Sequence, residues 1–320
     1  MLSTHKVEVV PVVLEPHPNA DTLSIVRVWG YTCCVRTADW QHRAIGAYIP
    51  PDSVVPNRPE FAFLDGHWRI KARKFRGVMS QGLLHPAPES ANIGDDVAEA
   101  LGVTHYEPPE VYELRTGGET ESPPFHTSKY DIDSGYRYGH LLTDGEEVVA
   151  TEKIHGANAT FCYHEGRMWA KSHREWKKPE SGAIWWKVQE QHPYIAIWCE
   201  ENPGLCLCGE VFGQVQDLKY GSKPGQLLFR AFDVMRLDGT FLDFDEFAEM
   251  VPVFYRCPLV YRGPYSIEKM REVCDGRSLV PGADNLREGV VVGPVKERWD
   301  ARLGRVKVKF VSPAYLERSK

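Results

Sequence analysis

A segment rich in proline, glycine and glutamate divides this chain of 320 residues into two parts. Proline removes a backbone donor and glycine resists ordering, so this composition is typical of an exposed linker. At roughly 100 to 200 residues per domain, the rest of the chain is long enough for two domains. The sequence therefore predicts one domain at residues 1–102, an acidic Pro/Gly-rich linker at 103–128 and a second domain at 129–320.

The overall composition fits a soluble protein with apolar cores, because 42% of the residues are hydrophobic and 26% are charged. No apolar run approaches the ~18 residues of a membrane span, and the first residues contain no signal-peptide core. The eight cysteines are scattered, and the close pairs Cys33-Cys34 and Cys206-Leu207-Cys208 lack the two-residue gap of paired zinc ligands. We expect reduced thiols and a monomeric, cytoplasmic protein without a membrane segment.

The first domain has the pattern of a small β-barrel. Short apolar runs such as VEVVPVVLEP and LSIVRVWGYTCCV are separated by Gly, Pro and Asp between Val7 and Leu101. The net charge of -6 argues against general binding to polyanions, but no acidic residue occurs between Asp65 and Glu89. A strand in that interval would turn cations outward, so we expect an RNA-binding patch made of Arg69, Lys71, Arg73, Lys74 and Arg76.

The sharpest local signal in the second domain is TEKIHGAN at residues 151–158, between the strand-like segments EEVVAT and ATFCYH. Lys153 then lies in a tight loop, where partial burial and neighbouring cations would lower the pKa of its amine and make it a nucleophile. Gly156 would let the backbone approach a bound ligand closely. Taken alone, the segment is explained equally well as a hairpin loop with a surface lysine.

Four further segments follow this loop in order: CGEVFG at 208–213, LFRAFDV at 228–234, REGVVV at 287–292 and VKVKF at 306–310. This order resembles that of the covalent nucleotidyltransferases, which include the ATP-dependent polynucleotide ligases and the mRNA capping enzymes. The wording TEKIHGAN, with His155 in place of the more widespread aspartate, is most similar to the RNA ligases. The resemblance covers residues 129–310 and implies antiparallel sheets with flanking helices.

The resemblance implies a role for each of these residues. Lys153 would be joined to AMP from ATP, while Lys307 and Lys309, on one face of a strand, would neutralise phosphate charge. Glu210 would contact the ribose or a metal-bound water, and Glu288 would help to hold the hydrated Mg²⁺ or Mn²⁺. His155 leaves the metal-binding aspartate of other members unrepresented. The nucleotide would also contact Glu152, Ile154, Gly156, Arg174 and Phe232, with Glu152 at the adenine edge and Phe232, or in competition Phe229, stacked on the base. Arg137 is a candidate for binding a 5′-phosphate.

Each of these features also has an ordinary structural explanation. The segment VKVKF fits an amphipathic surface strand, and Glu210 and Glu288 fit exposed carboxylates at strand ends. Phe232 fits a core aromatic. The fixed order of the motifs favours the catalytic interpretation over these alternatives.

The first domain carries a second resemblance. HPNADTLSIVRV at 17–28 and FRGVMSQGLL at 75–84 are similar to the OB-type RNA-binding domain of several aminoacyl-tRNA synthetases, over residues 5–102. The alternative is a β-barrel that serves only as a spacer. The expected fold is therefore α+β, with an N-terminal OB-type β-barrel followed by a nucleotidyltransferase domain.

Together the two resemblances imply an ATP-dependent RNA ligase that seals an RNA 3′-OH and a 5′-phosphate in a nicked duplex or broken RNA. A capping-type guanylyltransferase using GTP is the first alternative, disfavoured because residues 310–320 leave no room for a C-terminal OB domain. A non-catalytic RNA- or tRNA-binding protein is the second. The intact Lys153, Glu210, Glu288, Lys307 and Lys309 argue against it.

Overall fold

The computed structural model describes residues 5–106, 120–125, 130, 132–179 and 182–318. The chain forms two compact units, which divide at residues 109 and 110. Most of the predicted linker lies outside the described residues. At its ends, β10 (Thr104–His105) pairs with β6 (Ser53–Val54) of the first unit, and β11 (Thr120–Glu121) pairs with β16 (Trp176–Lys177) of the second.

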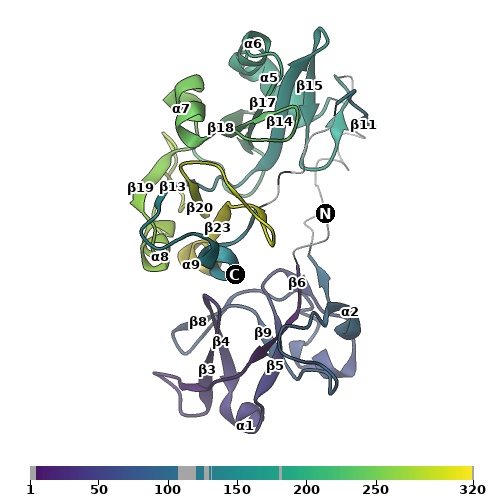
Figure 1. The fold of residues 1–320 in the computed structure, drawn as a ribbon, viewed down its shortest axis with the longest axis vertical. Helices are drawn as coiled ribbons and strands as arrows, with labels where there is room; N and C mark the ends of the chain where they lie inside the picture. Colours follow the sequence, from purple (N-terminus) through teal and green to yellow (C-terminus); the bar gives the residue numbers. More distant parts are fainter. Residues whose placement is uncertain (1–4, 107–119, 126–129, 131, 180–181, 319–320) are drawn as a thin grey trace. The chain divides into compact units, whose positions relative to one another are not determined.

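The first unit is a small β structure built from short antiparallel sheets (Figure 1). One sheet has the order β1-β5-β9, another β2-β3-β4, and β7 and β8 form a separate hairpin. Alternating side chains from these strands enclose an apolar core that includes Val9, Ile49 and Phe61. The strands are β1 (Glu8–Pro11), β2 (Glu15–Pro16), β3 (Leu23–Val28), β4 (Tyr31–Arg36), β5 (Ile45–Ile49), β7 (Arg73–Phe75), β8 (Val78–Ser80) and β9 (Leu83–His85), with helical turns α1 (Thr37–Trp40), η1 (Pro59–Leu64) and α2 (Ala98–Leu101).

The second unit contains two larger sheets. The first has the order β11-β16-β15-β14-β17-β18 and is antiparallel throughout. The second has the order β12-β23-β20-β13-β19 and is antiparallel except that β12 runs parallel to β23. Their remaining strands are β12 (Asp133–Ser134), β13 (Glu147–Glu152), β14 (Ala157–His164), β15 (Arg167–Lys171), β17 (Leu205–Gly213), β18 (Leu227–Arg236), β19 (Leu259–Pro264), β20 (Gly289–Pro294) and β23 (Val308–Val311).

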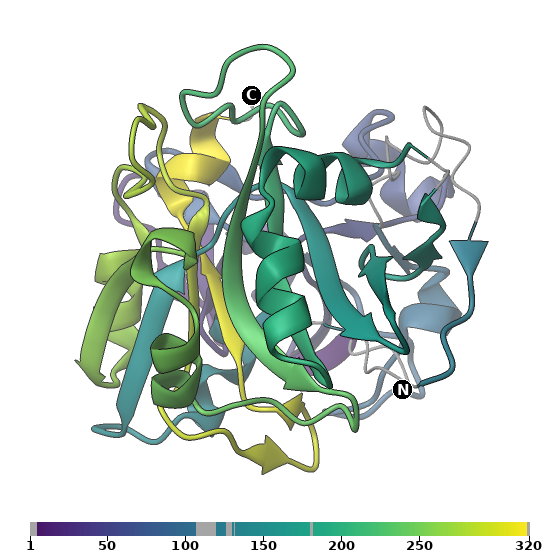
Figure 2. The same cartoon turned by 90° about the horizontal axis from the view of Figure 1, so that it is seen from above.

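Helices cover the six-stranded sheet and bury its apolar face. In α5 (Ile184–Gln191) the buried residues Ile184, Trp185 and Val188 recur at helical spacing, so one face of the helix packs on the sheet. The neighbouring α6 (Tyr194–Glu201) lies beside it, as Figure 2 shows. The sequence pattern at 181–201 is helical, but Pro193 has no amide hydrogen for a continuous helix and the segment forms two.

Shorter helices complete the unit. The segment that begins at Asp243 forms α7 (Phe244–Met250) with a capping box between Asp243 and Glu246. The others are α4 (Gly135–Tyr138), η2 (Gly139–Leu141), η4 (Val253–Tyr255), α8 (Ile267–Cys274) and α9 (Pro313–Arg318), and a small hairpin is made by β21 (Trp299–Asp300) and β22 (Gly304–Arg305). All eight cysteines are free thiols. Among the described residues, no helix is long and apolar enough to cross a membrane.

Candidate active site

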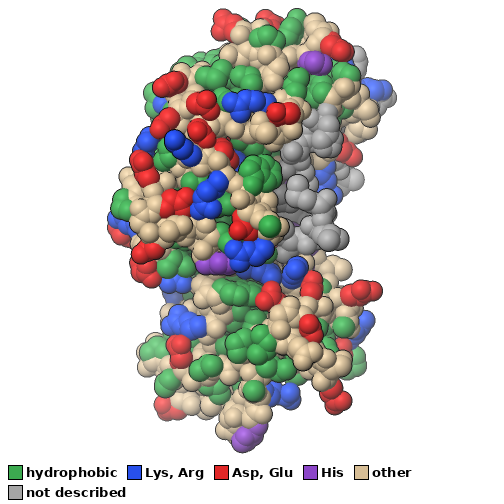
Figure 3. Space-filling view, in the orientation of Figure 1, with side chains coloured by type: hydrophobic (Ala, Val, Ile, Leu, Met, Phe, Trp, Pro, Cys, Tyr) green, Lys and Arg blue, Asp and Glu red, His purple; other side chains and the backbone are tan. Residues whose placement is uncertain are grey.

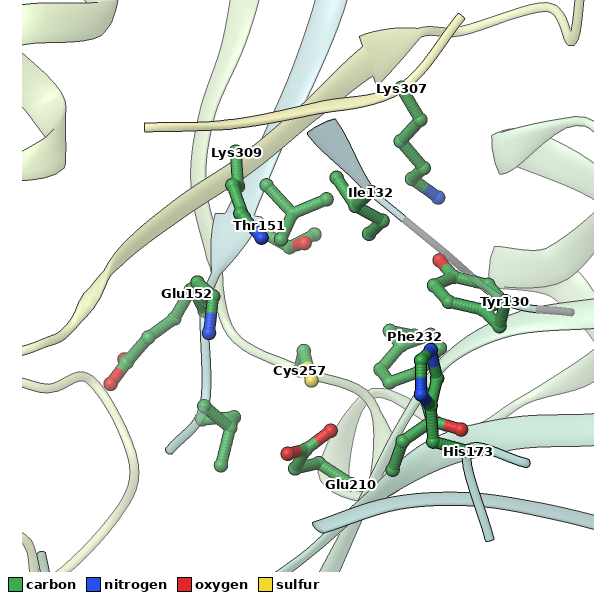
Figure 4. A pocket seen from close by; sticks show the side chains of 14 residues that line it. Tyr130, Ile132, Thr151, Glu152, His173, Glu210, Phe232, Cys257, Lys307 and Lys309 are labelled. Carbon is green, nitrogen blue, oxygen red and sulfur yellow. The ribbon is translucent and has the colours of Figure 1, made fainter. Parts of the chain in front are cut away.

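A cavity of about 210 Å³ lies in the second unit and is lined by strands from both of its sheets. β13 and β20 contribute Thr151, Glu152 and Val291, and β14, β17 and β18 contribute Asn158, Glu210 and Phe232. Residues from motifs that are far apart in the sequence, such as Lys153 and Lys307, therefore line one pocket. Its full lining is Tyr130, Ile132, Thr151, Glu152, Lys153, Ile154, Asn158, His173, Glu210, Phe232, Cys257, Val291, Lys307 and Lys309 (Figure 4).

Lys153 lies directly after β13, and its amine faces acidic groups. Its Nζ donates to Glu288 Oε1 at 2.7 Å. Burial by itself would lower the pKa of this amine, but the charges of Glu288 and Glu210 outweigh burial and raise it. The expectation that neighbouring cations lower this pKa is therefore wrong for the protein without ligands, because the immediate neighbours are carboxylates. The structure holds Lys153 as an ammonium ion.

The pKa values of the two carboxyl groups near Lys153 are shifted in opposite directions. Burial and the nearby charge of Glu288 raise the pKa of Glu210 to about 8, despite the attraction of Lys153. Burial also disfavours ionised Glu288, but Lys153 and His155 more than compensate and lower its pKa to about 2. Glu288 is thus the counter-ion of Lys153, whereas Glu210 is a half-buried carboxyl group that is mostly protonated and neutral near pH 7.

His155 is held on both sides of its ring. Its Nε2 lies 2.8 Å from Asp217 Oδ1, and its Nδ1 lies 3.3 Å from Glu288 Oε2. The backbone N–H of His155 donates to the hydroxyl of Tyr220 at 2.8 Å. The ring therefore orients Glu288 rather than lining the cavity. Since Glu288 also accepts the bond from Lys153, His155 helps to position Lys153 through Glu288.

Lys307, directly before β23, and Lys309, within it, both reach the cavity, as the alternation of VKVKF predicts (Figure 4). Lys307 Nζ lies 2.7 Å from each oxygen of Asp233, a residue of β18. Arg305 binds the same carboxylate through two bonds of 2.9 Å, and the Tyr130 hydroxyl also donates to it. Burial and the charge of Arg305 lower the pKa of Lys307, although Asp233 opposes this shift.

Asp233 is an unpredicted member of the site, and it holds two buried cations together. Its own pKa is strongly lowered because Arg305 and Lys307 outweigh its burial. Replacing it by Asn should reduce the free energy of unfolding by about 3 kcal/mol, since breaking a buried ion pair leaves cations uncompensated. Urea unfolding monitored by tryptophan fluorescence would measure the loss. Asp238→Asn is the matched control, because Asp238 is exposed and only accepts bonds from its own turn; an equal loss in both variants would contradict the assignment.

Other predicted residues lie elsewhere than expected. Arg174 is exposed and is not among the lining residues, and the preceding His173 occupies that position in the cavity. Gly156 does not line the cavity either. A Cβ atom there would lie 2.2 Å from the carbonyl oxygen of Val211, so the glycine is needed for the close approach of β17. Arg137 lies on α4, outside the lining of the cavity.

The structure separates the two aromatic candidates for a base contact. Phe229 is 1% exposed and packs against Phe161 in the core, whereas Phe232 faces the cavity beside Tyr130. Ile154 lines the same cavity. Glu152 is buried and its Oε2 accepts a bond of 2.6 Å from the Leu279 amide, while its Oε1 has no partner among the described residues. One oxygen of Glu152 is therefore committed to the protein.

Comparison with known proteins places this geometry in a family. The family model RNA ligase matches residues 146–311, and an OB-fold domain model matches residues 4–87. No curated protein matches the chain.

Solved structures of Naegleria gruberi RNA ligase are similar over nearly the whole chain. A lysine-to-alanine variant with ATP and Mn is 22% identical, with a TM-score of 0.82, and the match covers 97% of this chain and 98% of that one. A glutamate-to-alanine variant with AMP and Mn is 23% identical, with a TM-score of 0.83 and 99% coverage of both chains. The predicted α+β fold with an N-terminal OB domain is confirmed. Because the family model spans more than half of its residues, this chain belongs to the RNA ligase family.

Proposed function

We propose that this enzyme is an ATP-dependent RNA ligase that joins an RNA 3′-OH to a 5′-phosphate through a lysyl-AMP intermediate. The observation that carries the proposal is the position of Lys153, whose half-buried side chain lines one cavity with Lys307, Lys309 and Glu210. The similar Naegleria ligase was solved with ATP and Mn and with AMP and Mn, which supports the same nucleotide here.

In the first step, the neutral amine of Lys153 would attack the α-phosphorus of ATP. A bond forms between Nζ and phosphorus, the bond to the bridging oxygen breaks, and pyrophosphate leaves. Lys307 and Lys309 reach into the cavity as cations that neutralise charge on the phosphates during this transfer. Phe232 offers its ring for stacking on the base, and Ile154 and Val291 supply apolar contact.

The amine of Lys153 must first lose a proton, which Glu288 and Glu210 oppose in the structure described here. Their chemistry suits a divalent cation, because both side chains offer hard oxygen donors. A cation would favour the ionised form of Glu210, whose pKa is raised to about 8 in the protein without ligands. Among the described residues, no group of three His, Cys, Asp or Glu side chains is placed to hold a metal ion. Two carboxyl groups fit a cation that keeps several of its waters. When bound, Mg²⁺ or Mn²⁺ would neutralise the carboxylates and the transferred phosphate.

In the later steps AMP passes to the 5′-phosphate of RNA, and the 3′-OH attacks that phosphate and releases AMP. The OB domain would supply contacts to the polynucleotide. On the face shown in Figure 3, Lys and Arg side chains are interspersed with Asp and Glu, so RNA contacts are expected at local clusters rather than along a continuous basic band. The free thiols of all eight cysteines fit the proposed cytoplasmic location.

The choice of base separates this proposal from the capping-type alternative. Incubation of the enzyme with Mn²⁺ and either α-labelled ATP or α-labelled GTP, followed by a denaturing gel, should give labelled protein with ATP and at least about a hundredfold less with GTP, since a polar site rejects a mismatched edge strongly. Preferential labelling by GTP would support the guanylyltransferase. Labelling by neither nucleotide would favour a non-catalytic RNA-binding protein.

A further inference from the structure

The hairpin β7–β8 of the first unit is a short two-stranded ribbon. Its strands pair Arg73 with Ser80 and Phe75 with Val78. The two turn residues, Arg76 and Gly77, have φ angles of 45° and 92°, as the tightest hairpin turns require. Arg76 adopts this left-handed conformation although it is not glycine, so the turn must be held by its surroundings.

Two side chains from the loop between β2 and β3 hold that turn. His17 Nε2 donates to the carbonyl oxygen of Phe75 at 3.1 Å, and Asn19 Nδ2 donates to the carbonyl oxygen of Arg76 at 2.9 Å. His17 Nδ1 in turn accepts the backbone N–H of Asn19 at 3.1 Å. These contacts join the segment HPNADTL to the segment FRGVMSQGLL. The tip of the hairpin is therefore fixed before any ligand arrives.

The fixed tip presents an aromatic ring among cations. Phe75 is 41% exposed, and Arg73, Lys74 and Arg76 around it are exposed as well. Arg73 and Phe75 lie on the same face of the strand because alternate residues share a face. By contrast, Arg69 of the predicted patch is bound to Asp52 at 2.6 Å and lies over the Tyr106 ring. The predicted row of five cations is thus not one continuous strand.

From this geometry we infer that the β7–β8 tip is a binding site for an unpaired stretch of RNA, in which a base stacks on Phe75 and Arg73 and Arg76 contact the flanking phosphates. The inference rests on the proposed function for the identity of the polynucleotide. A base can expose its face to a side chain only when it is unstacked, so the site selects single-stranded RNA over duplex. The preformed tip lowers the ordering cost of binding.

The test compares short single-stranded RNA with a blunt duplex of the same length, using fluorescence anisotropy and the full chain. Phe75→Ala should weaken binding of the single strand by about tenfold and leave duplex binding unchanged. Phe75→Trp should restore it. The dependence on salt should be the same in Phe75→Ala as in the parent, because no charge is lost, whereas Arg73→Gln and Arg76→Gln should each lower the slope of log K against log salt by about 0.7.

Phe63→Ala is the matched control, because Phe63 is a 64% exposed phenylalanine of the same unit that lies outside the β7–β8 hairpin, in the segment PEFAFLD. Equal binding by Phe75→Ala and the parent, or an equal loss on single strand and duplex, would overturn the inference. A measurement on the unaltered protein guards against misfolded variants: ultraviolet cross-linking to uridine-rich RNA should yield an adduct in the peptide containing Phe75, and adducts only elsewhere would also overturn it.

The same preparations distinguish this inference from the proposed function. Labelling by α-labelled ATP reads the chemistry of Lys153 in the second unit, while anisotropy reads the hairpin. If protein–AMP forms normally and Phe75→Ala binds RNA as well as the parent does, only the hairpin site is refuted. If no protein–AMP forms but Phe75→Ala weakens RNA binding, the proposed ligase activity is refuted and the hairpin remains a binding site.

Discussion

Replacing Lys153 with arginine is expected to abolish formation of the protein–AMP adduct, by at least about a thousandfold, since the attacking atom is removed. Arginine keeps a positive charge beside Glu288, which Lys153 contacts at 2.7 Å, but its guanidinium stays protonated and cannot attack phosphorus. The substitution therefore tests nucleophilicity while leaving the ion pair in place. Labelling with α-labelled ATP, followed by a denaturing gel and acid treatment, measures the adduct.

The matched control is Lys269→Arg. Lys269 lies on α8, is half-buried, pairs with nearby Glu272 and does not line the cavity, so its replacement should leave labelling unchanged. Thermal unfolding of both variants shows whether they fold. An acid-labile adduct of normal yield in folded Lys153→Arg would assign the nucleophile to another lysine, and peptide mapping of the label would identify it.

Much of the pocket was predictable because strand alternation is local. The spacing of VKVKF is enough to place Lys307 and Lys309 on one face, and both line the cavity. The order of the motifs predicted that Lys153, Glu210 and Phe232 would meet. Local spacing does not tell which residue after the end of a strand turns towards a cavity. The prediction therefore chose Arg174, whereas His173 lines the cavity.

Asp233 could have been found from its surroundings in the sequence. It lies within LLFRAFDVMR, where apolar residues occupy most positions of a buried strand. A buried carboxylate needs cationic partners, and the sequence alone does not say that Arg305 and Lys307 supply them. For Gly156 the sequence shows the residue but not the reason for it. The small size is required by β17, which follows some 50 residues later in the chain.

The OB-type unit shows how a pattern can be correct in part. The interval without acidic residues predicted one strand that turns its cations outward, and Ile70, between Arg69 and Lys71, is indeed buried. Arg69 nevertheless forms only an isolated bridge to Val54, and β7 begins at Arg73. Asp52 lies outside the basic segment in the sequence but forms an ion pair with Arg69, whose charge is therefore already compensated.

Replacing Glu288 with glutamine is expected to slow the sealing of pre-adenylylated RNA by about a hundredfold or more, because the developing phosphate charge would lose its metal-binding partner. Glutamine keeps the size and hydrogen bonding of the side chain but removes its charge. Pre-adenylylated RNA bypasses the attack by Lys153, so this assay excludes effects that arise only from the lost ion pair between Lys153 and Glu288. Gel analysis of ligated product against time measures the rate.

The control is Glu147→Gln on the same sheet, because Glu147 pairs with the exposed Arg262 at the surface, where such pairs contribute little. Partial recovery of Glu288→Gln at high Mn²⁺ would support a weakened metal site, since mass action can offset a lower affinity. If Glu288→Gln instead seals pre-adenylylated RNA at the normal rate and fails only to form protein–AMP, Glu288 acts as the counter-ion of Lys153 in the first step. Its ion pair with the amine would then be its whole contribution, and the metal would have to depend on Glu210.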